Sequence, residues 1–413
     1  MNPRQENLIA VVDAGSSKVC VLVAELLDGV LRYRGHGIER ARGMRKGLIA
    51  ELGPAADAIN KAAITAERVS RAEIENVVVG IGGTHVHGVN SRGGIALGSR
   101  MREITREEVR AAVDRARSVA LPPDREVLHL LPQEFILDDQ AGIHDPIGMV
   151  GNKLEVNLHL STCSGCVAQS VVTCANRAGL EVGDTIYEGI AAAESVLSAD
   201  ERELGVCIAD IGSSTTELAV FFEGSIAHTA VLPIGGDHFT NDLAVGLHVS
   251  VEEAEHLKRT YGHCVVTSVP QVSEIEVGSR LAASSPSGEM QPSRMVRQRF
   301  LAEILEPRAR ELFTMLRDNL RQGGVLEALG AGCVLTGGAS QLAGLLDNAE
   351  SLLRVPTRVG SPVPLSRMPA ELAKPEFAVA IGMLLYTHRT QVRRASEEQG
   401  LRAKLKAIFA GSY

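Results

Sequence analysis

The chain has no tryptophan, and aromatic residues make up only 3% of its 413 residues. Valine, leucine, isoleucine and alanine must therefore supply most of the core, which at this length is large enough for two to four domains. No run of 18 or more apolar residues occurs, and residues 1–7 are polar. We therefore expect no membrane-spanning helix and no secretory signal peptide.

Other features that are absent from the sequence exclude particular ligands and binding sites. No Gly-Lys dipeptide occurs, which excludes the phosphate loop of P-loop nucleoside triphosphatases. A net charge of −8 argues against nucleic acid as a main partner. Seven cysteines, an odd number in a long chain, are typical of reduced cytosolic thiols. Cys163 and Cys166 form a Cys-x-x-Cys pair, but no second pair completes a zinc site, and the sequence does not decide whether they are redox-active.

Two segments of the chain carry the same pattern. Residues 13–17 read Asp-Ala-Gly-Ser-Ser, and residues 210–214 read Asp-Ile-Gly-Ser-Ser. Each follows a short apolar run and precedes a second one, which ends at an Asp-Gly or Glu-Gly turn dipeptide. This order predicts a duplicated unit of strand, glycine turn, strand and hairpin.

Two such turns that face each other could grip a polyphosphate between two lobes. Glycine allows close backbone approach, and serine hydroxyls with successive backbone N–H groups make an anion-binding nest. Asp13 and Asp210, at the strand ends, can hold Mg²⁺ through water. The residues expected at the phosphates are Gly15, Ser16, Ser17, Lys18, Gly212, Ser213, Ser214 and Thr215. The alternative, two ordinary hairpins with polar tips, is disfavoured by the matched context.

Two further motifs would complete a nucleotide site. Residues 333–340 place Thr-Gly-Gly-Ala after a buried strand and before a helix expected to begin near Gln341. Glu255 and Lys258, three residues apart on another helix, project to one side and could bind ribose hydroxyls. The backbone expected to lie against the adenosine is that of Gly337, Gly338 and Ala339. Taken alone, these motifs could also be a plain strand-to-helix turn and a surface ion pair.

This order of motifs resembles the superfamily of actin, heat-shock chaperone ATPases and sugar kinases. Residues 129–135 (HLLPQEF), 145–149 (DPIGM) and 151–156 (GNKLEV) narrow the resemblance. These stretches, together with residues 80–83 and 301–308, resemble the bacterial cell-division family FtsA. The resemblance covers nearly the whole chain. The resemblance implies an α/β actin-like fold, in which two lobes are built from duplicated ribonuclease-H-like domains and a small subdomain is relocated.

The motif order and the resemblance divide the chain into segments. The first lobe is expected at 7–83, 162–202 and 366–386, interrupted by the relocated subdomain at 84–161. The second lobe is expected at 203–235 and 300–365, interrupted by an insertion at 236–299. We also expect a long helix over 295–323 that Pro307 kinks or splits. A linker at 387–400 and a terminal helix at 401–413 complete the chain.

The terminal helix has the pattern of an interfacial amphipathic helix. At 100° per residue its apolar side chains fall on one arc, with basic side chains at the flanks. The segment 389–413 carries a net charge of +4 on an otherwise acidic chain. The apolar residues are Leu401, Leu405, Ile408 and Phe409, and the basic ones are Arg402, Lys404 and Lys406. A helix docked on its own protein is the alternative, but the membrane-targeting helix of FtsA matches this pattern.

The resemblance to FtsA implies a function in cell division. Such a protein binds ATP and Mg²⁺, polymerises, and tethers the division GTPase FtsZ to the cytoplasmic face of the inner membrane at the division site, where it helps recruit later division proteins. Arg297 and Arg299, before the 301–308 helix, are the expected dock for the C-terminal peptide of FtsZ.

Two questions stay open at this stage. Ser213 and Ser214 stand where many superfamily members carry glycine, so they crowd the terminal phosphate, and no general base is identifiable; we expect at most a weak Mg²⁺-dependent ATPase. The alternatives are a pilus-assembly relative of FtsA and a metabolic kinase or phosphatase of the superfamily. The tail and the 129–156 stretch favour FtsA.

Overall fold

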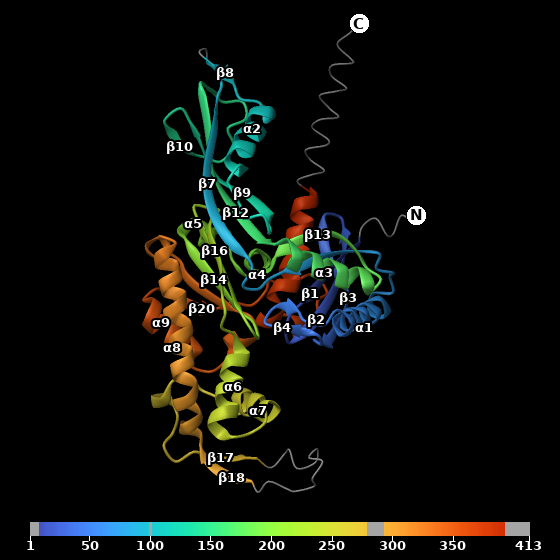
Figure 1. Cartoon of the computed structure of the whole chain (residues 1–413), viewed down its shortest axis with the longest axis vertical. Coiled ribbons are helices and arrows are strands. Elements are labelled where there is room, and N and C mark those ends of the chain that lie inside the picture. Colours follow the sequence, from blue (N-terminus) through green and yellow to red (C-terminus); the bar gives the residue numbers. More distant parts are fainter. Residues whose placement is uncertain (1–7, 99–100, 279–292, 393–413) are drawn as a thin grey trace.

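The computed structural model of the protein describes residues 8–98, 101–278 and 293–392. These residues form an elongated molecule (Figure 1). Two lobes lie side by side at its centre, a small subdomain extends from one end, and a mainly helical subdomain extends from the other. Residues 393–400 of the expected linker and the expected membrane-binding helix at 401–413 lie outside the described residues.

Each lobe contains a five-stranded sheet, and the two sheets have the same strand order. Three consecutive strands form an antiparallel meander, and two later strands add in parallel beside the first strand of the meander. The first sheet consists of β1 (Leu8–Ala14), β2 (Lys18–Leu27), β3 (Val30–Arg40), β6 (Asn76–Ile81) and β13 (Glu181–Tyr187). The second consists of β14 (Val206–Ile211), β15 (Thr216–Phe222), β16 (Ser225–Leu232), β19 (Gly332–Thr336) and β20 (Thr357–Val359). The predicted duplication is confirmed.

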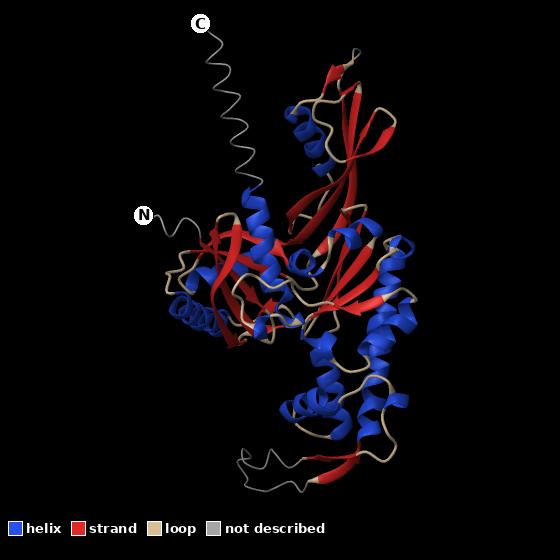
Figure 2. Cartoon of the chain, turned by 180° about the vertical axis from the view of Figure 1, so that it is seen from behind, coloured by secondary structure: helices blue, strands red, loops and turns tan. Residues whose placement is uncertain are grey.

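Helices cover these sheets (Figure 2). The first-lobe helices are α1 (Leu52–Ser70), α3 (Gly165–Arg177), α4 (Glu188–Val196) and a helix at 378–392, whereas α5 (Ala199–Leu204) packs against β15 of the second lobe. In place of bulky aromatics, α1 buries alanines at helical spacing. Because a Cβ atom at Gly37 of β3 would lie 1.9 Å from the carbonyl oxygen of Ala62, helix and strand pack at the closest approach that glycine allows.

The small subdomain is a four-stranded antiparallel sheet with one helix against it. Its elements are β7 (His87–Ala96), β8 (Arg102–Glu103), α2 (Arg106–Arg117), β9 (Arg125–Leu137), β10 (Gln140–Ile143), β11 (Val150–Gly151) and β12 (Lys153–Ser164). Thr105 begins α2, and its N–H donates to the Glu108 carboxylate at 2.7 Å, so the capping box in the sequence is formed.

The helical subdomain and the remaining second-lobe elements follow β16. They are α6 (Gly236–Leu247), α7 (Val251–Tyr261), η1 (Val266–Ser268), β17 (Glu274–Val277), β18 (Arg294–Arg297), α8 (Gln298–Gln322), η3 (Leu326–Ala328), η4 (Gly338–Gln341) and α9 (Leu345–Leu353). Shorter pieces elsewhere are β4 (Met44–Arg45), β5 (Leu48–Ile49), η5 (Ala370–Leu372) and η6 (Pro375–Phe377).

The long helix starts later than predicted, and it is not split at Pro307. It begins at Gln298 because residues 294–297 form β18, where Arg297 pairs with Glu274 of the antiparallel strand β17. It also runs unbroken through Pro307. Pro307 and Glu303, whose carbonyl loses its helical N–H partner there, are both exposed, so water can replace the missing hydrogen bond.

Two other boundaries move. The helix expected near Gln341 is first a 3₁₀ turn, η4, and α9 begins only after Gly344, whose φ of +76° separates the two. Residues 387–392, predicted as linker, continue the helix that starts at 378. Thr387 is buried there, and the Arg389 guanidinium pairs with Glu194 of α4 at 3.2 Å, which anchors this end of the helix.

Buried polar contacts hold the two lobes together. Tyr187, at the end of β13, is fully buried, and its hydroxyl lies 3.0 Å from the carbonyl oxygen of Ala230 and 3.2 Å from that of Leu218, both in the second lobe. The Gly83 N–H of the first lobe donates to Glu217 Oε1 of β15 at 2.8 Å. These contacts fix one side of the space between the lobes.

Candidate nucleotide-binding cleft

A cleft of about 1200 Å³ lies between the lobes where the two Asp-x-Gly turns meet. Its volume exceeds the roughly 300–1,000 Å³ typical of small-ligand pockets. Every nucleotide-site residue predicted from the sequence lines this one cleft: Asp13, Gly15, Ser16, Ser17, Lys18, Asp210, Gly212, Ser213, Ser214, Thr215, Glu255, Lys258, Gly337, Gly338 and Ala339. The fold thus brings together four motifs that are far apart in the chain.

The two turns have the same backbone geometry. We call residues 13–18 the first turn and residues 210–215 the second turn. The Gly15 N–H donates to the carbonyl oxygen of Lys18 at 3.0 Å, and the Gly212 N–H donates to that of Thr215 at the same distance. A Cβ atom added to either glycine would lie 3.3 Å from that same oxygen. Each strand therefore reverses tightly and presents its backbone to the cleft.

The aspartate that opens each turn is buried and costly to ionise. Burial raises the pKa of Asp13 to about 6, although Lys18 opposes the shift. Burial, with repulsion from Glu217 and Asp13, raises the pKa of Asp210 to about 7. A cation in the cleft would stabilise both carboxylates in their charged form.

Two more carboxylates in the cleft were missed from the sequence. Burial raises the pKa of Glu217 to about 7 and that of Glu188 well above its ordinary value. Glu217 Oε2 receives no hydrogen bond from the described part of the chain. A charged residue at the start of an apolar strand, seven positions after Asp210, was the signal for Glu217. Glu188 directly follows Ile186 and Tyr187, the buried end of β13, which is a weaker signal.

These carboxylates fit a hydrated magnesium ion. Among the described residues, no three His, Cys, Asp or Glu side chains lie close enough to hold a metal directly. Mg²⁺ commonly keeps several waters and binds through one or two carboxylates together with phosphate oxygens. The unpaired Glu217 Oε2 and the buried Asp13 and Asp210 suit that arrangement.

The two predicted lysines both line the cleft, but each already has a carboxylate partner. Lys18 Nζ lies 3.2 Å from Glu376 Oε2 and 3.6 Å from the centre of the Phe377 ring. Lys258 Nζ lies 2.6 Å from Glu255 Oε2, so this pair projects to one side of α7, as the sequence predicted. Lys258 is buried, which rules out the solvated surface pair that stood as its alternative.

The glycine turn at the adenosine side fits against the second turn. Gly337 has a φ of +84°, and a Cβ atom there would lie 2.2 Å from Asp210 Oδ1. The Gly337 N–H donates to the carbonyl oxygen of Pro375 at 3.2 Å. Only glycine meets both constraints, so the backbone that leads into η4 is held close to Asp210.

The serine hydroxyls of the turns have different partners. Ser16 Oγ accepts the Gly47 N–H at 2.8 Å. Ser214 Oγ donates to Asp237 Oδ2 at 3.1 Å, which turns this side chain toward α6. Ser214 therefore crowds a phosphate less than the sequence suggested, and Ser213 is the serine of this loop that keeps that role.

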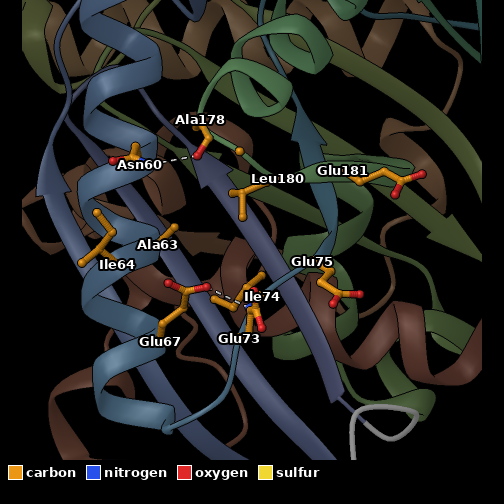
Figure 3. A pocket seen from close by; sticks show the side chains of 11 residues that line it. Asn60, Ala63, Ile64, Glu67, Glu73, Ile74, Glu75, Ala178, Leu180 and Glu181 are labelled. Carbon is orange, nitrogen blue, oxygen red and sulfur yellow. Dashed lines mark hydrogen bonds between the residues drawn. The ribbon is translucent and has the colours of Figure 1, made fainter. Parts of the chain in front are cut away.

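A second hollow, of about 520 Å³, lies on the first lobe between α1 and the start of β13 (Figure 3). Asn60 Nδ2 donates to the carbonyl oxygen of Ala178 at 2.9 Å, and Glu67 Oε1 accepts the Ile74 N–H at 2.9 Å. Its charged side chains are Glu67, Glu73, Glu75 and Glu181. Its lining contains no cationic side chain and no counterpart of the two Asp-x-Gly turns, and we assign it no function.

The residues expected to bind FtsZ lie far from the cleft between the lobes, in the helical subdomain (Figure 1). Arg297 is exposed in β18, and Arg299, in the first turn of α8, lies 3.7 Å from Glu303. Within the described ranges, none of the helices is long and apolar enough to cross a bilayer.

Comparison with known proteins identifies the family. The model "Cell division protein FtsA" matches residues 207–382, and "SHS2 domain inserted in FTSA" matches residues 83–162. The cell division protein FtsA of Pseudomonas aeruginosa is 38% identical over 380 residues, which are 92% of this chain and 89% of that protein. The chain belongs to the FtsA family.

Solved structures agree on the fold. The PilM–PilN type IV pilus biogenesis complex contains a chain with a TM-score of 0.63 and 19% identity, covering 93% of this chain and 99% of that one. MreB5 of Spiroplasma citri bound to ADP gives a TM-score of 0.54 and 14% identity over 95% and 98%. At these identities the likeness shows the fold alone. This FtsA protein is therefore an actin-like cell division protein, as its sequence predicted, and its small subdomain is the one matched by the SHS2 model.

Proposed function

We propose that this FtsA protein binds Mg·ATP between its lobes, polymerises, and links FtsZ to the cytoplasmic face of the inner membrane at the division site, where it helps recruit later division proteins. The observation that carries the proposal is the pair of matched glycine turns facing each other across a cleft that holds buried carboxylates. A metabolic kinase or phosphatase would not need the basic amphipathic tail in the sequence.

In this arrangement the backbone N–H groups of both turns receive the phosphates. Asp13, Asp210 and Glu217 would hold a hydrated Mg²⁺, which would offset the negative charge of the phosphates. Gly337 to Ala339 lie against the adenosine, and the Glu255–Lys258 pair binds the ribose. An actin-like neighbour, MreB5, is bound to ADP, which supports a nucleotide in this fold.

Hydrolysis needs a group that accepts a proton from the attacking water. Glu217 is a buried carboxylate in the cleft, and its pKa, raised to about 7, suits such a base near neutral pH. Glu188 also lines the cleft, but burial raises its pKa well above the ordinary value, which favours its protonated form. Ser213 remains beside the phosphate position. We therefore expect weak Mg²⁺-dependent ATPase activity rather than fast turnover.

The FtsZ dock is proposed at the start of α8. The C-terminal peptide of FtsZ is acidic and apolar in its family, which suits a surface that combines Arg297 and Arg299 with exposed apolar side chains. Met295 and Phe300, beside these arginines, are 60% and 42% exposed. Reversing both charges should weaken peptide binding about tenfold, most strongly at low salt.

Fluorescence anisotropy with the FtsZ peptide tests this dock. Arg310→Glu with Arg321→Glu is the matched control, because it makes the same charge change on the same helix, at least about 16 Å further along. If the control weakens binding as much as Arg297→Glu with Arg299→Glu, only net charge matters and the dock lies elsewhere.

Membrane attachment is proposed to depend on assembly. Burying four apolar tail residues contributes at most roughly 6–12 kcal/mol, and ordering the tail opposes this by roughly 1–2 kcal/mol per residue. One tail should therefore bind weakly, whereas a filament presents many tails. Deleting 401–413 should abolish liposome co-sedimentation, and an assembly-blocked, tail-intact variant should bind weakly. Tight binding by that variant would show that one helix suffices.

A further inference from the structure

The cleft is lined by four cationic side chains: Lys18, Arg40, Lys258 and Arg259. Lys18 is paired with Glu376 and Lys258 with Glu255. Among the described residues, Arg40 has no carboxylate partner, and it stands beside the first turn. Its charge is therefore available to an anionic ligand in the cleft.

The sheet places Arg40 next to Lys18. Arg40 is the last residue of β3 and lies directly opposite Lys18, the first residue of β2. Directly opposed residues of antiparallel strands project to the same face, and like charges in such a pair repel each other. The Glu376 carboxylate offsets only one of the two positive charges. An anion between the two side chains would turn this repulsion into attraction.

The segment after Arg40 is fastened to the first turn at two points. The Ala41 N–H donates to the carbonyl oxygen of Ser17 at 3.0 Å, and the Gly47 N–H donates to Ser16 Oγ at 2.8 Å. Gly47 lies in the turn of the hairpin formed by the short strands β4 and β5. The backbone that carries Arg40 is thus held against the predicted phosphate nest, which limits its freedom before any ligand binds.

The neighbours of Arg40 also indicate which phosphates it can reach. Glu376, the partner of Lys18, lies beside the adenosine motif, since a Cβ atom at Gly338 would be 3.7 Å from Glu376 Cβ. On the other side of the first turn, Gly47 packs against Gly83, which bonds to Glu217. Arg40 therefore belongs to the side of the turn nearer the adenosine.

We propose that Arg40 binds the phosphates nearest the adenosine, and so contributes to the affinity for MgATP and MgADP alike. The inference rests on the proposed nucleotide binding. In this arrangement Arg40 and Lys18 flank the diphosphate that both nucleotides share. The terminal phosphate lies toward Gly47, Gly83 and Glu217.

Calorimetry on the full chain with MgATP, MgADP and adenosine tests the assignment. Arg40→Ala should raise the Kd of both nucleotides by about tenfold, the size of a charge-assisted hydrogen bond, and leave adenosine binding within twofold. Arg40→Lys should keep part of the affinity. Arg42→Ala is the matched control, because it removes the same charge two residues away, at an exposed position outside the cleft lining, and it should change neither Kd more than twofold.

Three results would overturn the assignment. They are unchanged nucleotide affinity in Arg40→Ala, a loss confined to MgATP, and an equal loss for adenosine, which would indicate a structural role. If the wild-type protein binds none of the three ligands, the proposed function itself fails, and that result is distinct from a failure of Arg40 alone.

Discussion

The first and second turns share a backbone but differ in what surrounds them. Both close with the same 3.0 Å hydrogen bond across the glycine. The first turn is bordered by the cations Lys18 and Arg40. The second is bordered by the carboxylates of Glu217 and Asp237, and Asp237 accepts a hydrogen bond from Ser214. Duplication has preserved the turn, whereas the added side chains beside its two copies differ: two cations beside the first and two carboxylates beside the second.

This difference separates two tasks that a nucleotide site must perform. The cation-rich copy suits phosphate, and the anion-rich copy suits Mg²⁺. The pKa values of the two aspartates follow the same division, about 6 for Asp13 beside Lys18 and about 7 for Asp210 beside Glu217. If the division holds, matched substitutions in the two turns will have unequal effects.

The largest effect is expected from the aspartates. Asp210→Asn should weaken ATP binding in Mg²⁺ by about 100-fold and Asp13→Asn by only about tenfold, since one charge-assisted contact is worth roughly 1.5–3 kcal/mol. In excess chelator, Asp210→Asn should bind ATP no worse than wild type, because a repulsive charge has been removed. Calorimetry in both conditions measures this. Equal losses for the two variants in Mg²⁺ would break the comparison.

The next effect concerns how the adenosine motif supports the second turn. Gly337→Ala places a Cβ atom 2.2 Å from Asp210 Oδ1 at a φ of +84°, so Asp210 must move. We expect about tenfold weaker ATP binding and a Tm lower by roughly 3–8 °C. Gly183→Ala is the control: it lies outside the cleft lining and its Cβ meets nothing closer than 4.0 Å, so thermal shift and calorimetry should both show little change. Matching losses in the two variants would place the strain elsewhere.

The sequence predicted this cleft well where the signal was local. The glycine turns and the Glu255–Lys258 pair depend on residues within a few positions of one another, and the structure forms both of them. The duplicated pattern also predicted the duplicated sheets.

The features that could not be predicted from the sequence depend on contacts between residues that are far apart in the chain. Lys18 meets Glu376 across 358 positions of chain, so its partial neutralisation has no local signature. Arg40 acquires its place only through its register with Lys18. Residues 294–297 have a helical pattern but become a strand because β17 offers Glu274 opposite Arg297. In each case tertiary pairing overrides or adds to local preference.

The smallest effect tests the buried charge of Glu217 without any ligand. A carboxyl whose pKa is raised by folding binds more protons in the folded than in the unfolded state. Its burial therefore costs stability above about pH 7 and nothing once pH falls below its ordinary pKa, near 4. Glu217→Gln should raise the Tm of the nucleotide-free protein at pH 8 by roughly 2–6 °C, and this advantage should vanish toward pH 5.

The difference between variant and wild type is the quantity to measure, because other groups titrate in the same range. Burial lowers the pKa of His129 and His159 to about 4, so these histidines favour folding at higher pH and partly mask the carboxylates in the wild-type profile. They are present in both proteins, and their contribution cancels in the difference.

Glu73→Gln, at an exposed position, is the control, and its Tm difference from wild type should not change with pH. Saturating Mg·ATP should reduce or reverse the Tm advantage of Glu217→Gln, since a bound cation stabilises the carboxylate that the variant lacks. A pH-independent advantage of Glu217→Gln would mean that the amide improves packing, and that Glu217 carries no buried charge for the second turn to present to a metal.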